Sequence, residues 1–218
     1  IDPLWLSPSG LYASQLVSEL HAQAVTTMPE HTGYSHMAIH PYPRYLVQQH
    51  HFSSGQRWAL RPIRPEDAQA LQEFVRNLSE ESRYMRFVSM MRELSASMLS
   101  RYTRIDYDRE LALVATIPHH TSNKDEGDQV IAFARDGVGA EYALVVADDW
   151  QRHGLGVQMM RALIQAATHQ GLSYIDGYVL ASNYAMLGLL KHLGFKDDMD
   201  KYDPSLRRVW LELPQQAS

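Results

Sequence analysis

The sequence predicts an α+β fold with a mixed sheet behind a short N-terminal appendage, and three observations lead to this prediction. Segments with strand and helix periodicity alternate from Trp58 to the C-terminus. A strand, a glycine loop, a helix and a second strand follow one another between Tyr142 and Val179, which requires a parallel crossover connection. The first fifty residues instead carry five prolines and little periodicity.

Regular patterns begin with a strand from Trp58 to Ile63, after which Pro65 opens a helix. Proline suits a first helical turn, and the two acids that follow it suit the positive end of the helix dipole. A second helical stretch is expected from Glu80 to Arg104, with a break near Ser89. The later segments are expected as strands 110–116, 129–135, 142–147, 174–179 and 209–213, helices 156–169 and 183–193, and a loop at 118–128.

Composition excludes several classes of protein. A net charge of -5 and a pI of about 6.1 provide no basic field for nucleic acid or an anionic membrane. The chain has no cysteine, so it has neither disulfides nor thiolate metal sites. No apolar run approaches the roughly 18 residues that span a bilayer. The sequence therefore predicts a soluble, cytoplasmic protein without a nucleic-acid or membrane partner, and it leaves the oligomeric state open.

The most informative segment lies between the apolar strand 142–147 and the helix that follows it. It reads Gln151-Arg-His-Gly154-Leu-Gly156. A helix start leaves backbone N–H groups unpaired at the positive end of the helix dipole, and glycines let a phosphate approach the main chain. The pattern indicates a site for an anion such as a diphosphate, while two glycines alone are equally typical of a sharp turn.

A second motif follows at the helix 183–193, where the segment from Asn183 to Phe195 ends in Gly-Phe. In this order, the two motifs resemble the two signatures of the GNAT superfamily of N-acetyltransferases, and the resemblance extends from Arg57 to Pro214. The loop lacks the Gly-Lys-Ser or Gly-Lys-Thr ending of a nucleotide P-loop. It also lacks an acidic ribose-binding residue, which argues against a dinucleotide fold.

The resemblance implies a GNAT fold in which acetyl-CoA, the cosubstrate, lies between two splayed parallel strands, those of Val146 and Tyr178. Leu144 and Val146 would offer backbone groups to the pantetheine arm. Asn183 would contact the same arm, or it would be an ordinary helix N-cap. The residues expected around the diphosphate are Gln151, Arg152, His153, Gly154, Leu155 and Gly156. Backbone contacts are favoured there, and the side chains of Arg152 and His153 would otherwise be solvated.

Acetyl transfer to a lysine needs a base, because the lysine ammonium has a pKa of about 10.4. Glu141 begins the strand that leads into the loop, where it resembles the glutamate base of some bacterial protein acetyltransferases. The reserve candidates are Asp106, Asp108 and Glu110. The family often places a tyrosine acid four residues before the Gly of Gly-Phe, but Leu190 stands there in this chain.

Residues 1–56 resemble the end of the ATP-grasp region of NDP-forming acyl-CoA synthetases, followed by a linker. The matching stretches include Ile1-Asp-Pro-Leu and Gly10-Leu-Tyr-Ala, whereas Ser14-Gln-Leu departs from the synthetase pattern. In one bacterial architecture, such a region precedes the GNAT domain of enzymes that acetylate lysines of other proteins, notably acetyl-CoA synthetase. Residues 57–218 would then be the GNAT acetyltransferase domain.

The expected function is transfer of an acetyl group from acetyl-CoA to the ε-amine of a protein lysine, with Glu141 as the base. An acyl-CoA synthetase is one such protein substrate. Two alternatives are a GNAT enzyme that acetylates a small amine and a noncatalytic module that senses acyl-CoA. His36 and His40 have the spacing of metal ligands on one helix face, but no third ligand accompanies them, so no metal is expected.

Overall fold

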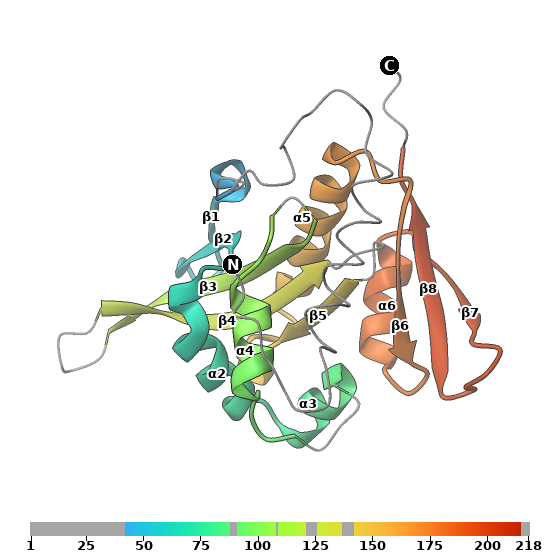
Figure 1. The fold of residues 1–218 in the computed structure, drawn as a ribbon, viewed down its shortest axis with the longest axis horizontal. Helices are drawn as coiled ribbons and strands as arrows, with labels where there is room; N and C mark the ends of the chain where they lie inside the picture. Colours follow the sequence, from blue (N-terminus) through green and yellow to red (C-terminus); the bar gives the residue numbers. More distant parts are fainter. Residues whose placement is uncertain (1–41, 88–90, 108, 121–125, 137–141, 215–218) are drawn as a thin grey trace, which may run out of the picture. The chain divides into compact units, whose positions relative to one another are not determined.

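The computed structural model describes residues 42–87, 91–107, 109–120, 126–136 and 142–214, which all belong to one compact unit (Figure 1). The synthetase-like stretches and the His36/His40 pair lie outside the described residues. The strands are β1 Gln48–His51, β2 Arg57–Pro62, β3 Leu111–His120, β4 Glu126–Asp136, β5 Tyr142–Val146, β6 Tyr174–Leu180, β7 Lys196–Met199 and β8 Leu206–Glu212. The helices are α2 Ala68–Asn77, α3 Glu80–Phe87, α4 Ala96–Thr103, α5 Leu155–His169 and α6 Tyr184–His192, with short 3₁₀ turns η2 Arg44–Leu46, η3 Pro65–Asp67 and η4 Asp148–Trp150.

The strands form two sheets, one of five strands in the order β1-β2-β3-β4-β5 and one of three in the order β6-β8-β7. Every hydrogen-bonded pair among the described strands is antiparallel. Strands β5 and β6 are in contact at the junction of the sheets and are connected through α5, but they belong to different hydrogen-bonded sheets (Figure 1). This break is the splay that was expected between the strands of Val146 and Tyr178.

Side chains alternate along the five-stranded sheet and fill a core on each of its faces. On β3, Leu111 and Leu113 belong to the core that includes α5, whereas Ala112 and Val114 belong to the core that includes α2. The amphipathic α5 covers the first face with fully buried residues such as Met159. Helices on both faces therefore hold the strands that lead to the candidate site, and the α+β fold class is confirmed.

The N-terminal boundary differs from the sequence prediction, because the expected linker up to residue 56 contains strand β1. This strand pairs with β2 from Gln48 opposite Leu60 to His51 opposite Arg57. Its polar sequence gave no apolar alternation, but the residues around it are anchored, since Leu46 and Phe52 are both buried in the core. The structured unit therefore includes residues 42–56.

Two other segments also differ from the prediction. The expected loop 118–128 is partly strand, because β3 and β4 continue as a hairpin in which Pro118 pairs with Asp128. Strand β7 was not expected, because its sequence, Lys-Asp-Asp-Met, shows no apolar alternation. All four residues are exposed in the structure. It forms because its backbone completes the ladder of β8, from Lys196 opposite Trp210 to Met199 opposite Arg207.

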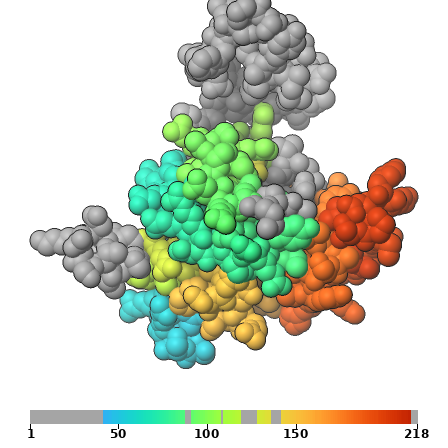
Figure 2. Space-filling model, turned by 90° about the horizontal axis from the view of Figure 1, so that it is seen from below, coloured from blue at the N-terminus to red at the C-terminus, as the bar shows by residue number. Residues whose placement is uncertain are grey.

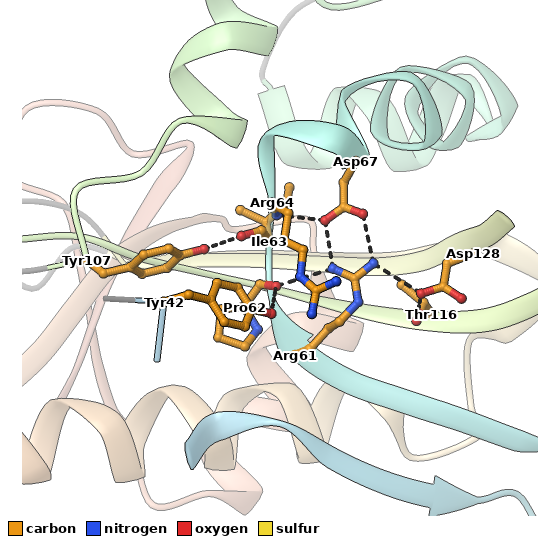
Figure 3. Close-up of polar contacts among 9 residues, drawn as sticks. All are labelled: Tyr42, Arg61, Pro62, Ile63, Arg64, Asp67, Tyr107, Thr116 and Asp128. Carbon is orange, nitrogen blue, oxygen red and sulfur yellow. Dashed lines mark hydrogen bonds and ion pairs between the residues drawn. The ribbon is translucent and has the colours of Figure 1, made fainter. Parts of the chain in front are cut away.

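A buried charge network fixes the end of β2 where the chain turns into α2 (Figure 3). The Arg61 guanidinium donates two hydrogen bonds of 2.7 Å to the Asp67 carboxylate. It donates a third, of 3.2 Å, to Asp128 on β4, which also accepts the hydroxyl of Thr116. Asp67 in turn accepts the Arg64 backbone N–H at 2.7 Å, so one carboxylate joins the strand end to the helix start.

Candidate functional site

The backbone of β5 has one edge that faces away from the five-stranded sheet. Ala147 donates its N–H to the Ile131 carbonyl of β4 at 2.9 Å. Hydrogen-bonded and non-hydrogen-bonded pairs alternate along an antiparallel ladder, and Val146 is the next residue, opposite Ala132. The backbone groups of Val146 and Leu144 therefore point away from β4, toward the side where β6 lies. This is the edge that the sequence analysis expected to receive an amide-bearing ligand.

Tyr142 packs across Gly177 and joins β5 to β6 through side-chain contact. A Cβ at Gly177 would lie 2.9 Å from the Tyr142 ring and 3.2 Å from its carbonyl oxygen, so glycine is what permits this approach. The Tyr142 ring also meets Phe195 edge-on at 5.6 Å between centroids. Burial raises the pKa of Tyr142, and its buried hydroxyl has no hydrogen-bond partner in the described part of the chain. No sequence pattern indicated a role for this residue.

The loop between β5 and α5 has an unusual backbone. Arg152 has a φ of 62° and Gly154 a φ of 81°, both in the left-handed region. For a non-glycine residue this conformation is uncommon and is often found at functional sites. Gly154 precedes the first turn of α5, whose N–H groups lack intrahelical partners. The loop thus combines two left-handed residues with a helix start, a backbone arrangement that suits an anion.

The two loop glycines have different surroundings. Nothing lies within 4 Å of the position that a Cβ would take at Gly154, so this side of the loop is open. At Gly156, a Cβ would lie 2.6 Å from Leu189 Cδ1 and 3.7 Å from Leu144 Cδ2. Gly156 therefore lets the start of α5 pack against α6 and β5, and Leu155 beside it is a core residue with 1% exposure.

An aromatic cluster supports the loop from the side of β1. The Phe52 ring stacks on Trp150 at 5.0 Å and on Trp58 at 5.7 Å, and His50 stacks on Trp58 at 4.4 Å. His153 lies against Phe52 and Trp150, with its Nδ1 2.8 Å from the Gln151 carbonyl oxygen. One of the loop's neighbours in space, Phe52, thus comes from a segment that was expected to be a linker.

Three residues at helix α6 bear on the expected site. Asn183 is the N-cap of α6, where its Oδ1 accepts the Met186 N–H at 3.1 Å, so the N-cap alternative is confirmed for that oxygen. Leu190, in the place of the family's tyrosine, is a core residue with 1% exposure. Tyr184, on the first turn of α6, is 80% exposed.

The expected base, Glu141, lies outside the described residues, as does Asp108. Among the other candidates, Glu110 forms an ion pair with Arg135, whose Nε is buried without a partner in the described structure. The ladder places Arg135 opposite Ala143, near the start of β5. The ion pair with Arg135 occupies this carboxylate, so this geometry disfavours Glu110 as the base.

Comparison with known proteins identifies the class to which this fold and loop belong. Residues 57–196 match the family model of the acetyltransferase (GNAT) domain. This chain therefore belongs to the GNAT family of acetyltransferases, which use acetyl-CoA as the acyl donor. The match includes the loop and the helix α6, and ends just after the Gly-Phe motif.

Particular relatives come from bacteria. The acetyltransferase PA5475 of Pseudomonas aeruginosa is 32% identical over 149 residues, which cover 68% of this chain and 80% of the relative. The acetyltransferase Pat of Mycolicibacterium smegmatis is also 32% identical over 149 residues, but these cover only 42% of Pat. The crystal structure of the GNAT domain of S. lividans PAT superposes with a TM-score of 0.70 at 25% identity, over 79% of this chain and all of that domain.

The described residues contain neither a metal-binding cluster nor a membrane-spanning helix. No group of three or more His, Asp or Glu side chains is arranged to hold a metal ion in the described ranges. None of the helices described here is both long and apolar enough to cross a membrane.

Proposed function

We propose that this protein transfers the acetyl group of acetyl-CoA to the ε-amine of a lysine on a protein substrate, with Glu141 as the general base. The observation that carries the proposal is the path formed by the outward-facing backbone of β5 and the loop at the start of α5. Leu144 and Val146 lie on that strand edge, and Gly154 lies at the end of the path. A long, thin ligand with amides at one end and phosphates at the other fits this order.

The residues present fit acetyl-CoA by chemistry. Peptide-like amides of a pantetheine arm pair with an unpaired strand edge, as an added strand would. Backbone N–H groups from Arg152 to Gly156 suit the diphosphate, and the open side of Gly154 leaves room for it. At Asn183, the side-chain oxygen is already bonded, which leaves the NH₂ group as the donor toward the pantetheine arm.

Acetyl-CoA supplies an activated acyl group, and the protein supplies position and a proton acceptor. Glu141 takes a proton from the lysine ammonium, directly or through a water molecule. The neutral amine then attacks the thioester carbonyl, and the amide forms as the carbon–sulfur bond breaks and the attacking nitrogen gives up a second proton to water. The electron pair leaves with the CoA sulfur as a thiolate. Because the thiol of CoA has a pKa near that of cysteine, its thiolate is a good leaving group and needs no dedicated acid. This is consistent with a leucine at position 190.

The proposal of a protein acceptor rests on the resemblance to bacterial lysine acetyltransferases that carry a synthetase-like region. An acyl-CoA synthetase is therefore the first protein to test. The similarity to Pat supports this choice. The small-amine alternative has its own support, since L-methionine sulfoximine/L-methionine sulfone acetyltransferases are 41% identical over 56 residues, or 26% of this chain. That match is short, so we place the protein acceptor first.

The experiment is incubation of the protein with isotopically labelled acetyl-CoA and a bacterial lysate, followed by mass spectrometry of acetylated lysines. A Glu141→Gln variant should lower kcat by roughly 10²- to 10⁴-fold, while its affinity for acetyl-CoA stays near wild type, as expected for loss of a base. Normal turnover in this variant would assign the proton transfer to another group. Labelling of small amines only would support the alternative enzyme, and binding without any CoA release would support the sensor.

A further inference from the structure

The carboxylate of Asp148, which begins the η4 turn just before the loop, is bound by a helix far away in sequence. It accepts the Ser79 backbone N–H at 2.9 Å and the Ser79 hydroxyl at 2.8 Å. It also accepts the Ser82 hydroxyl at 2.7 Å. Ser79 and Ser82 lie at the start of α3, and Ser79 Oγ accepts the Ser82 N–H as a cap. The start of α3 is therefore capped partly by a residue of the cofactor-loop region.

The same contacts reach the loop itself. The Gln151 side-chain NH₂ group donates to Ser82 Oγ at 3.2 Å and to the Val146 carbonyl at 3.3 Å. A hydroxyl of α3, the first loop residue and the free edge of β5 are thus linked in one chain of hydrogen bonds. Figure 2 shows the green surface of the α3 region directly beside the yellow-orange surface of the segment that contains the loop.

This arrangement offsets the electrostatic repulsion between nearby carboxylates and a bound diphosphate. Two carboxylates, Asp148 and Asp149, stand directly before a loop that should receive a doubly charged diphosphate, and like charges repel. None of the ion pairs among the described residues involves Asp148. Its charge is instead taken up by hydroxyl and N–H donors and by the positive end of the α3 dipole. Burial opposes ionisation of Asp148, but the bonds from Ser79 and Ser82 outweigh it and lower the pKa of the carboxyl.

We propose that Ser79 and Ser82 of α3 are positioning residues for acetyl-CoA, which hold Asp148 and Gln151 so that the loop presents its backbone N–H groups to the diphosphate. The proposal rests on the proposed role of residues 151–156. Because coupling between two elements is reciprocal, acetyl-CoA on the loop should also stabilise the first turns of α3. Sequence analysis predicted α3 but gave these serines no role, since the partner carboxylate is 66 to 69 residues away.

The test is calorimetric binding of acetyl-CoA to the full chain and its variants. The double variant Ser79→Ala with Ser82→Ala should bind acetyl-CoA roughly three- to tenfold more weakly, on the scale of a lost helix cap. The variant Ser79→Thr with Ser82→Thr keeps both hydroxyls and should restore most of the affinity. The matched control is Ser95→Ala, which removes the N-cap of α4, where Ser95 Oγ accepts the Met98 N–H at 3.2 Å. It should lower stability comparably and leave the affinity unchanged.

Hydrogen exchange with and without acetyl-CoA separates this inference from the proposed function. Protection of both residues 80–87 and 151–156 on addition of acetyl-CoA supports the inference. Protection of 151–156 alone, together with normal affinity in the alanine variant, overturns it and leaves the cofactor loop intact. An equal loss of affinity in Ser95→Ala also overturns it, because general destabilisation would then explain the effect. Absence of protection at both segments would overturn the loop assignment as well.

Discussion

Asp67 and Asp148 each accept a backbone N–H near the start of a helix, but their carboxylates are bound by different groups. Asp67 is 8% exposed, lies three residues from the N–H that it accepts, and is paired with the Arg61 guanidinium (Figure 3). Asp148 is exposed, caps a helix from 69 residues away, and is held by neutral donors. The first set of contacts is local in the sequence, whereas the second joins two segments that are far apart in the chain.

The difference shows how burial determines the use of a charge. A carboxylate that is withdrawn from water needs a cation and a full set of donors, so it belongs to the framework. A carboxylate at the surface costs little to release, so it can follow the conformation of a loop. We therefore expect changes at Asp67 to act mainly on stability, and changes around Asp148 to act mainly on binding with a small effect on stability. Three predictions test this division.

The largest effect is expected at Asp67. Its replacement by alanine leaves the Arg61 guanidinium buried without its main partner, and such a loss costs about 3–5 kcal/mol of unfolding free energy. Urea denaturation measures this cost, and the affinity of the folded fraction for acetyl-CoA should stay unchanged. Glu93→Ala is the control, because its ion pair with Arg76 is similarly close, at 2.6 Å against 2.7 Å, but both of its side chains are more than half exposed. It should cost below about 1 kcal/mol. Equal costs in the two variants would contradict the division.

An intermediate effect is expected at Gly154. A valine there must take a φ of 81°, which a β-branched residue avoids, so the loop should change shape. We expect acetyl-CoA affinity to fall at least about tenfold, or about 1.4 kcal/mol. The matched control is Gly171→Val. Gly171 has a φ of 74° and equally open surroundings, but it lies after the C-terminal end of α5, away from the loop. Calorimetry should show normal affinity in the control. Equal loss in both variants would remove the loop from the site.

The smallest effect concerns pH. Because the folded protein lowers the pKa of Asp148 below its ordinary value of 3.8, ionised Asp148 contributes stability above that value. This contribution is lost as the pH falls through the lowered pKa. The difference in unfolding free energy between wild type and Asp148→Asn should therefore be constant from pH 5 to 7 and shrink below about pH 4. If the difference in unfolding free energy does not depend on pH, the charge of Asp148 does not stabilise the start of α3.

Much of the fold could be predicted from the sequence, because its main elements follow local rules. The helix that begins after Pro65 and the strand–loop–helix unit around Gly154 were found by periodicity and turn residues, and the structure confirms them. Strands β1 and β7 were missed, since both are polar and exist because a neighbouring strand offers its backbone. The extended β3–β4 hairpin was missed because its polar sequence resembles a loop.

The parts of the candidate site that depend on a local backbone motif could be predicted from the sequence. The parts that depend on contacts between distant segments could not. The loop motif indicated a helix start, and the structure adds a left-handed Arg152 that no pattern could show. Gly156 was expected to face the ligand, but its surroundings show that it also allows α5 to approach Leu189. The contacts of Asp148 with Ser79 and of Trp150 with Phe52 join segments far apart in the chain, and no local pattern predicts them.

The break between the two sheets also affects how the isolated protein should be handled. Among the described strands, β5 and β6 each end a sheet, so each has one edge that no other strand pairs. Unpaired edges are templates for strand addition between molecules, which leads to aggregation. A bound pantetheine arm would occupy the β5 edge. We therefore expect acetyl-CoA or CoA in the buffer to lengthen the shelf life of concentrated samples, by blocking edge-to-edge association.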